Sequence, residues 1–184
     1  MYHIATFHGT FAFIKPWTAV RDRETFSMQF LTPSVIEGIE KKLFPELLQQ
    51  SGIKKILRHK LTYASTSSQQ EVIQAKSCKK PKTNLREMSI IFRNVLLNPT
   101  LLLAFNNAED AKTAATQHIC LCRNEDILLP EAEIVTMTEE EFNALDGYEL
   151  RFGQSDKSFL VGYNRFDNSA PMYGGIEYNG NKIL

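Results

Sequence analysis

Residues 21–43 read RDRETFSMQFLTPSVIEGIEKKL, and this stretch decides the fold. Its first half alternates charged or polar residues with apolar ones, a pattern that is typical of a half-buried strand. In its second half, apolar side chains recur at steps of three and four residues, which places them on one face of a helix. These apolar residues are Val35, Ile36, Ile39 and Leu43. The sequence therefore predicts an extended segment that leads into a helix over residues 33–50.

The junction between strand and helix is Thr32-Pro33-Ser34. Proline suits the first turn of a helix, where its missing N–H has no intrahelical partner to lose. Ser34, followed three residues later by Glu37, also has the spacing of a capping box. The helix is therefore predicted to begin sharply here.

Length and composition restrict the class of protein. The chain has 184 residues, which suits one domain, or one domain with a small extension. It contains no apolar run of membrane-spanning length, and its first residues lack the pattern of a secretory signal, so we expect a cytoplasmic protein without a membrane partner. Cys78, Cys120 and Cys122 are few and odd in number, which indicates reduced thiols rather than a disulfide framework.

The distribution of charge is uneven although the net charge is zero. Residues 51–93 carry ten Lys and Arg against two acidic residues, and residues 94–184 carry six against fourteen. A concentrated basic segment suggests a polyanionic partner such as nucleic acid. The alternative is a solvated basic face that binds nothing.

The remaining segments favour strands over helices. IKKILRHKLTYAS, from residue 53, has the pattern of a half-buried strand with a cationic outer side. Residues 65–84 are polar and rich in Ser and Lys, and predict a long excursion. Two apolar runs separated by Asn98-Pro99 predict two strands, HICLCR predicts another, and Thr138 with Glu141 predicts a capped short helix. Asn179-Gly180 indicates a tight hairpin. We expect an α+β fold with a largely antiparallel sheet.

Motifs of known chemistry are absent from the sequence. There is no Gly-rich phosphate loop, nucleophile elbow or zinc-binding Cys pair, so we expect no cofactor and no metal. His118, Cys120 and Cys122 would share one face of a strand, but alternate strand residues lie about 7 Å apart, too far for one ion to bind all three. We interpret the cysteines as buried strand residues. Of the histidines, His59 lies in the basic segment and is a weak acid–base candidate.

Three segments resemble the CRISPR-associated Cas-five family. FHGTFAFIKPWTAVRDRETFSMQFLTPSVIEGIEKKLF, residues 7–44, resembles the N-terminal signature of that family, with its Thr-Pro step and a Gly-Ile pair at Gly38-Ile39. The resemblance implies that the Thr32-Pro33 step and Gly38 set how the helix packs on the sheet. LREMSIIFRNVLLNPTLLLAF, residues 85–105, resembles the central strand pair. HICLCRNEDILLPEAEIV, residues 118–135, resembles a later strand, where Cys122-Arg123-Asn124-Glu125 approximates a Leu-Gly-x-Arg-Glu pattern.

The resemblance implies a ferredoxin-like, RNA-recognition-type (RAMP) domain with a protruding thumb hairpin. We expect this domain over residues 1–130, with the thumb at 65–84, and a small C-terminal β-rich extension over residues 131–184. It also implies a subunit of a type I interference (Cascade) complex, which caps the 5′ handle of the CRISPR RNA and contacts the backbone (Cas-seven-type) and large subunits.

In that role, cations would hold phosphates and aromatic rings would stack on bases. The expected RNA-binding residues are Lys15, Trp17, Arg21, Arg23, Arg58, Lys60, Tyr63, Lys76, Lys79, Lys80, Lys82 and Arg86. Arg21 and Arg23 lie in the extended lead-in to the helix, and replacing both is expected to weaken RNA binding without unfolding the protein.

Two other functions are kept open. One branch of the family cleaves precursor CRISPR RNA without a metal, using a Tyr after the first helix and a Lys-His pair. Here Phe44 takes the position of that Tyr, and Lys112 has no neighbouring His. The remaining catalytic candidates are weak: His59 with Lys60 or Tyr63. A further alternative is a stand-alone interaction module or a virus-encoded mimic that inserts into such a complex.

Overall fold

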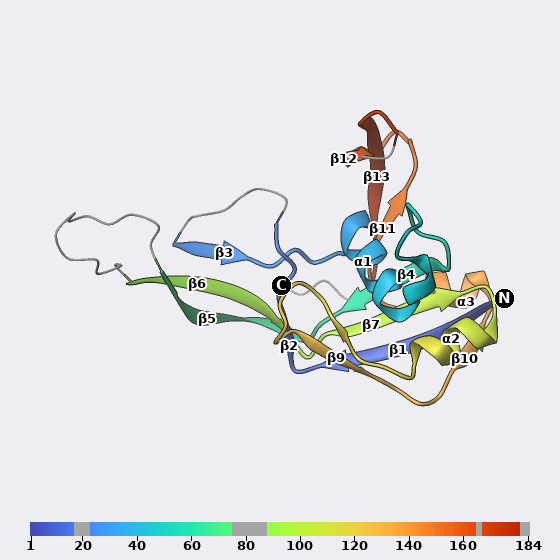
Figure 1. Cartoon of the computed structure of the whole chain (residues 1–184), viewed down its shortest axis with the longest axis horizontal. Coiled ribbons are helices and arrows are strands. Elements are labelled where there is room, and N and C mark those ends of the chain that lie inside the picture. Colours follow the sequence, from blue (N-terminus) through green and yellow to red (C-terminus); the bar gives the residue numbers. More distant parts are fainter. Residues whose placement is uncertain (17–22, 75–87, 165–166, 181–184) are drawn as a thin grey trace.

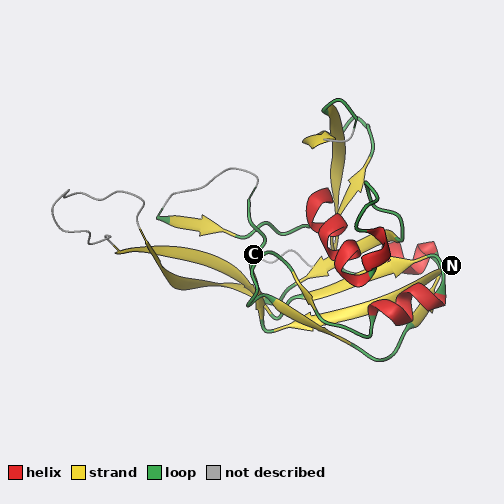
Figure 2. Cartoon of the chain, in the orientation of Figure 1, coloured by secondary structure: helices red, strands yellow, loops and turns green. Residues whose placement is uncertain are grey.

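The computed structural model describes residues 1–16, 23–74, 88–164 and 167–180 of the chain. The strands are β1 (Tyr2–Gly9), β2 (Phe11–Ala12), β3 (Glu24–Phe26), β4 (Ile56–Thr62), β5 (Ser65–Gln74), β6 (Met88–Leu97), β7 (Thr100–Phe105), β8 (Ile119–Cys120), β9 (Ile127–Pro130), β10 (Val135–Met137), β11 (Gly147–Phe152), β12 (Phe159–Asn164) and β13 (Ala170–Asn179). The helices are α1 (Pro33–Leu43), α2 (Ala108–Ala114) and α3 (Glu139–Ala144), and a short 3-10 turn spans Pro45–Leu47. Figure 1 shows their arrangement and Figure 2 colours them by type.

The centre of the larger sheet has the ferredoxin-like order. Its strands run β4-β7-β1-β9, and each neighbouring pair is antiparallel. Helix α1 connects β1 to β4, and α2 connects β7 to the β8–β9 edge. This is a β-α-β-β-α-β unit in which the first strand lies between the third and the fourth. The predicted α+β, ferredoxin-like fold with a largely antiparallel sheet is confirmed.

A long hairpin interrupts this unit between β4 and β7. Strands β5 and β6 pair antiparallel along ten residues each, from Ser65 opposite Leu97 to Gln74 opposite Met88. The short strands β2 and β3 pair with the other side of β6, β3 in parallel. In Figure 1 this smaller sheet extends away from the body of the molecule. We call β5 and β6 the thumb hairpin; its residues 75–87 lie outside the described part of the chain.

The turn at Asn98-Pro99 is formed as predicted. Asn98 takes a positive φ of 48° between β6 and β7, a conformation that Asn tolerates better than most residues. The predicted hairpin at Asn179-Gly180 is described only on one side, because residues 181–184 lie outside the described ranges. Gly180 has a φ of 118°, in the region that favours glycine.

Helix α1 differs from the prediction at both ends. Its N-cap is Thr32, which makes no side-chain capping bond, and Glu37 instead accepts from Lys41 Nζ at 2.6 Å and from the Gly52 N–H at 3.1 Å. The capping-box prediction for Ser34 and Glu37 is therefore wrong. The helix ends at Leu43, not at residue 50, because Pro45 disfavours helical backbone at the residue before it.

The capping box of α3 is formed as predicted. The Glu141 N–H donates to Thr138 Oγ1 at 3.2 Å, and Glu141 Oε2 accepts from the Thr138 N–H at 2.7 Å. Two orphan N–H groups of the first turn are thereby satisfied by one side-chain pair.

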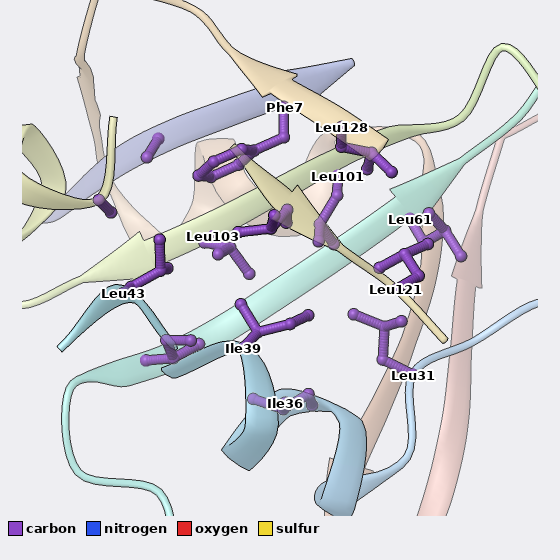
Figure 3. Packing of buried hydrophobic residues seen from close by; sticks show 14 of the residues in the cluster. Phe7, Leu31, Ile36, Ile39, Leu43, Leu61, Leu101, Leu103, Leu121 and Leu128 are labelled. Atoms are coloured by element: carbon purple, nitrogen blue, oxygen red, sulfur yellow. The ribbon is translucent and has the colours of Figure 1, made fainter. Parts of the chain in front are cut away.

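The main core lies between the sheet and helices α1 and α2. Alternation along β1 sends Ala5 and Phe7 to this side and Ile4 to the opposite one. Figure 3 shows side chains of α1 converging on those of the sheet. The labelled core residues are Phe7, Leu31, Ile36, Ile39, Leu43, Leu61, Leu101, Leu103, Leu121 and Leu128.

Helix α3 covers part of the opposite face of the sheet. Phe142 of α3 is fully buried against Ile4 and Ala104 and packs edge-on against Tyr2, with ring centroids 5.7 Å apart. Both faces at this end of the sheet are therefore covered, by α1 and α2 on one side and by α3 on the other.

Residues 131–184 continue the larger sheet. Strand β10 pairs with β1, β11 pairs with β4, and β13 and β12 follow β11 outward. In Figure 1, β12 and β13 stand up from the rest of the sheet. The boundary of the extension at residue 131 stays a prediction. Among the described residues, no helix has the length and hydropathy of a membrane span.

The segment HICLCR forms less strand than predicted. Only Ile119–Cys120 is strand, because the next residues turn back on themselves: the Leu121 N–H donates to the Asp126 carbonyl at 3.2 Å, and the Asp126 N–H donates to that of Arg123 at 3.1 Å. Cys120 is partly exposed and Cys122 exposed, so their interpretation as buried strand residues is wrong. Cys78 lies outside the described residues.

Candidate nucleic-acid interface

A cationic pocket lies where the thumb hairpin joins the body of the molecule. Its volume is about 250 Å³, and we call it the root pocket. It is lined by Phe13, Lys15, Pro16, Thr25, Glu71, Arg93, Cys122 and Arg123. These residues come from five segments: the chain after β2, strand β3, strands β5 and β6 of the hairpin, and the turn before β9.

Two guanidinium groups of the root pocket pack on one phenyl ring. The Arg93 guanidinium lies 5.3 Å from the centroid of the Phe13 ring, and that of Arg123 lies 5.4 Å from it. Phe13 is only 3% exposed, so its ring is a buried support rather than a surface for ligand. Cations over an aromatic face are attracted to it, which fixes both guanidinium groups in place.

Each arginine is also held by a carboxylate. Arg93 Nε donates to Glu71 Oε2 at 3.0 Å, and its Nη1 donates to Thr25 Oγ1 at 3.1 Å. Arg123 Nη2 donates to Asp126 Oδ1 at 2.7 Å, and Asp126 is fully buried. Hydrogen bonding to Asp126 raises the pKa of Arg123. The pocket therefore offers ordered N–H donors whose direction is set before any ligand arrives.

Lys15 adds an exposed cation to the root pocket. Its backbone N–H donates to Cys122 Sγ at 3.5 Å, which ties the segment after β2 to the turn before β9. Cys122 is exposed as a residue, but the protein around its thiol partly removes water from it, which raises the pKa of the thiol and favours its neutral form. Within the described residues, no carboxylate forms an ion pair with Lys15. Its placement here agrees with the RNA-binding role expected for it, which stays a prediction.

Arg58 and Lys60 are not on an outer surface. Both lie under α3 and are 6% and 4% exposed. Arg58 forms a bidentate ion pair with Glu149. Lys60 Nζ donates to the backbone carbonyls of Asn143 and Leu145. Burial lowers the pKa of Lys60. The predicted cationic outer side of β4 is wrong, because α3 covers it, and neither residue is accessible to RNA in this conformation.

The weak catalytic candidates do not form an accessible site. His59 lies between Arg58 and Lys60 in β4, so its side chain points to the opposite face of the sheet. It is 3% exposed, and its Nε2 is buried without a hydrogen-bond partner among the described residues. Burial, and then the charge of Arg58, lowers its pKa to about 3. Tyr63 stacks on Tyr148 with ring centroids 6.1 Å apart, and burial raises its pKa to about 12. Neither group is poised to transfer protons near neutral pH.

Phe44 and Lys112 do not complete an active site either. Phe44, which matches the catalytic Tyr of the cleaving branch, is 1% exposed. Its ring packs edge-on against Phe105, with centroids 5.9 Å apart, and Lys55 Nζ lies 4.0 Å from its centroid. The ring is part of the core. Lys112 is exposed in the last turn of α2.

Arg23 lies on the side of the smaller sheet away from the root pocket. Its guanidinium is 5.7 Å from the centroid of Phe92, and Phe92 and Arg93 are consecutive strand residues that point to opposite faces. Phe26 is 64% exposed, and its partner in β6 is Asn94, which lies on the same face as Phe92. Arg23 is thus accessible but separate from Lys15.

The other expected RNA-binding residues lie outside the described ranges. They are Trp17, Arg21, Lys76, Lys79, Lys80, Lys82 and Arg86. Trp17 follows directly after Pro16, which lines the root pocket.

Sequence reasoning did not select Arg93, Arg123 or Glu71 as site residues. Arg93 did carry a signal, because it interrupts the apolar run SIIFRNVLL, and a charge inside such a strand requires a partner or a function. Arg123 stood in the segment that resembles the family but was not assigned a role. Glu71 had no local signal, since only the pairing of β5 with β6 brings it to Arg93.

A larger groove lies elsewhere, between the start of α1 and strands β11 to β13. Its volume is about 600 Å³. Apolar and aromatic side chains dominate its walls, including Phe152, Tyr163, Met172 and Tyr173. Within its described lining the only charged residue is Glu37, which Lys41 already neutralises. The groove therefore has little to attract a polyanion, and the root pocket is the better nucleic-acid candidate.

Comparisons with known proteins support the fold of this chain but do not establish its function. No protein-family model matches the sequence, and no curated protein matches it. Among solved structures, one similar chain is described as "CRISPR RNA-guided surveillance complex". The TM-score is 0.55 at 10% sequence identity, over 97% of this chain and 90% of that one. At this identity the likeness shows a shared fold, over nearly the full length of both chains.

Proposed function

We propose that this chain is an RNA-binding subunit of a type I CRISPR interference complex, in which it caps the 5′ handle of the guide RNA and contacts the backbone subunits. The observation that carries the proposal is the root pocket: Lys15, Arg93 and Arg123 converge where a long hairpin is inserted into a ferredoxin-like domain. The resemblance of residues 7–44 to the Cas-five signature and the description of the similar structure support it independently.

The chemistry of the root pocket suits single-stranded RNA. Guanidinium and ammonium groups bind phosphates, and guanidinium planes stack on unpaired bases. Three cations close to a cluster of carboxylates do not make a strongly positive surface by themselves. We therefore expect the pocket to act together with the other expected RNA-binding cations of the segment 51–93, which are Lys76, Lys79, Lys80, Lys82 and Arg86.

The thumb hairpin is well shaped for a contact with a neighbouring subunit. It extends away from the body of the molecule in Figure 1, and among the described residues β5 pairs only with β6, so that its outer edge carries no further strand. A sheet edge with unpaired backbone groups can accept a further strand from a partner. The hairpin would then reach the backbone subunit while the root pocket holds the RNA.

We propose binding without cleavage. A metal-independent ribonuclease needs an accessible acid and base near the scissile phosphate. In this chain Phe44 has no hydroxyl and is buried, His59 is buried and held neutral, and Lys60 Nζ is bonded to two carbonyls. These observations favour a binding subunit over the processing enzyme.

The test is a binding and cleavage assay on one sample. Purified full chain is mixed with a labelled RNA of a CRISPR repeat from the same genome, in EDTA, over a series of salt concentrations. We expect binding that weakens steeply with salt and an RNA that stays intact. Arg93→Ala with Arg123→Ala is expected to weaken binding, and Arg151→Ala, an exposed cation of β11, serves as the matched control.

The outcomes separate the candidate functions. Cleavage of the repeat in EDTA, abolished by His59→Ala, would replace the proposal with a processing nuclease. Co-purification with backbone subunits, but no RNA binding by the chain alone, would instead favour an interaction module or mimic. Equal binding by the double variant and wild type would remove the root pocket from the proposal.

A further inference from the structure

Resting on the RNA-binding function proposed above, we propose that the root pocket binds one unpaired base of the RNA and selects guanine. Ligand pockets for drug-sized molecules span about 300–1,000 Å³. The root pocket, at about 250 Å³, falls just below that range. Its size therefore suits a fragment, such as one base or one phosphate, rather than a stretch of chain.

The charge of its walls favours a base over a phosphate. Arg93 is paired with Glu71 at 3.0 Å, and Arg123 with Asp126 at 2.7 Å, so each guanidinium already has a carboxylate. The Glu71 side chain is 41% exposed and lines the pocket, where it would repel a phosphate. A carboxylate is an acceptor only, and the edge of a base supplies the N–H groups that it needs.

The neighbouring donor and acceptor fit one base best. Arg93 supplies N–H donors beside the acceptor oxygens of Glu71, and the two groups touch. Guanine is the one RNA base whose Watson–Crick edge places a carbonyl next to two N–H groups, so that O6 can face Arg93 while N1–H and N2–H face Glu71. Uracil presents a single N–H between two carbonyls, and adenine and cytosine present one amino group beside acceptors.

The position of both groups is fixed by the fold. In the smaller sheet Thr25 is the register partner of Arg93, and Glu71 is the partner of Ile91, two residues before Arg93. The side chains of Thr25, Glu71 and Arg93 therefore point to the same face, which lines the pocket. Arg93 and Arg123 are braced on Phe13, so a base can stack on a guanidinium plane that is already ordered. Such ordering lowers the entropy cost of binding.

The test compares the affinities of RNAs that differ only in the hydrogen-bonding groups of one base. Full-length protein is titrated with a labelled short oligouridine that carries guanosine, inosine or uridine at one position, and affinity is read by fluorescence anisotropy at several salt concentrations. We expect guanosine to bind roughly tenfold more tightly than uridine. Inosine lacks the N2 amino group and is expected to bind about three- to tenfold more weakly than guanosine. This comparison uses the wild-type protein and depends on no variant.

A pair of variants then assigns the contact. Glu71→Gln is expected to abolish the difference between guanosine and inosine. Glu24→Gln is the control, because Glu24 is an exposed carboxylate on the opposite face of the same sheet, bonded to Asn94 at 2.9 Å. Thermal melting of both variants checks that they are folded, which is expected because both side chains are at least partly exposed.

Three results would overturn the inference. Equal affinity for the three RNAs, with a steep salt dependence, would leave the proposed RNA-binding function in place and refute the guanine pocket. An Arg93→Ala variant that weakens all three RNAs by the same factor would assign the pocket to a phosphate instead. Absence of RNA binding under every condition would refute the RNA-binding function and the guanine pocket together.

Discussion

Arg58 of β4 and Glu149 of β11 form a buried, bidentate ion pair. Arg58 Nε lies 2.5 Å from Glu149 Oε1, and Nη2 lies 2.7 Å from Oε2. The side chains are 6% and 2% exposed, so neither charge is solvated by water to any extent. The ion pair joins the ferredoxin-like unit to the strands that follow residue 131. At this junction β4 and β11 are paired through one pair of register partners, Leu61 and Tyr148.

Breaking this pair is expected to destabilise the protein strongly. In Glu149→Gln, Arg58 keeps its buried charge and its exposed partner Glu139, 3.3 Å from Nη1, but loses its buried carboxylate partner, and such a loss costs about 3–5 kcal/mol. The free energy of unfolding from urea denaturation is the measurement. Glu177→Gln, which removes an exposed partner 3.8 Å from Arg151, is the control and should change stability by less than about 1 kcal/mol. An unchanged midpoint for Glu149→Gln would contradict the buried pairing.

Lys15 is expected to contribute to RNA binding through charge alone. Replacing Lys15 with Ala should weaken binding of every RNA sequence by a similar factor and reduce the slope of log K against log salt by roughly 1. Stability should not change, because the Lys15 side chain is exposed and its hydrogen bond to Cys122 uses the backbone N–H. Lys157→Ala, another exposed lysine, is the control for non-specific attraction. An unaltered slope would place Lys15 outside the RNA interface.

Buried His59 is expected to make stability depend on pH. Its native pKa of about 3 lies below the ordinary value of 6.5, so between these two values the unfolded chain binds a proton that the native chain does not. Stability is therefore retained above pH 6.5 and falls, as the pH is lowered toward 3, by about 1.4 kcal/mol per pH unit. Urea denaturation at a series of pH values measures this slope.

Replacement of His59 identifies the source of that slope. His59→Leu should flatten it, and it leaves no buried nitrogen without a partner. His118→Ala, at an exposed histidine, should leave the slope as it is in wild type. A slope that persists in His59→Leu would assign the acid sensitivity to other groups.

Two glycines are expected to respond in opposite directions to substitution by alanine. Gly38 lies in the middle of α1 with open space where a Cβ would stand, so Gly38→Ala should stabilise the protein by about 0.5–1 kcal/mol. Gly147 has a φ of 130°, and a Cβ there would lie 3.0 Å from the Leu61 carbonyl oxygen, so Gly147→Ala should destabilise it. Thermal melting measures both. The expectation that Gly38 sets the packing of α1 on the sheet is wrong, since its position faces open space.

Local patterns predicted those parts of the fold that depend on neighbours in sequence. The three- and four-residue steps of α1, the capping box at Thr138 and the turn at Asn98 each follow from interactions within a few residues. Of the extended segment predicted before Thr32, only Glu24–Phe26 is strand among the described residues. The Ser34 capping box failed because the N-cap is Thr32, two residues earlier, and Glu37 accepts from Lys41 and Gly52 instead.

The candidate site was less predictable because it is built from distant residues. Lys15 was selected from sequence and lies in the root pocket, but Glu71 reaches Arg93 only through the register of the thumb hairpin, and Arg123 reaches Phe13 only through the turn that Asp126 closes. Arg58 and Lys60 were selected and are buried, because a helix more than 70 residues further along the chain covers them.

The sequence by itself determined the class of the molecule: one α+β chain with a largely antiparallel sheet, a basic middle segment and a resemblance to a family of RNA-binding subunits. Tertiary structure alone decided which cations are available. The periodicity of a strand determines which side chains share a face, but whether that face is exposed to solvent depends on which elements pack against it. Helix α3 buries the cations of β4, while the thumb hairpin gathers Arg93, Arg123 and Lys15 around one pocket.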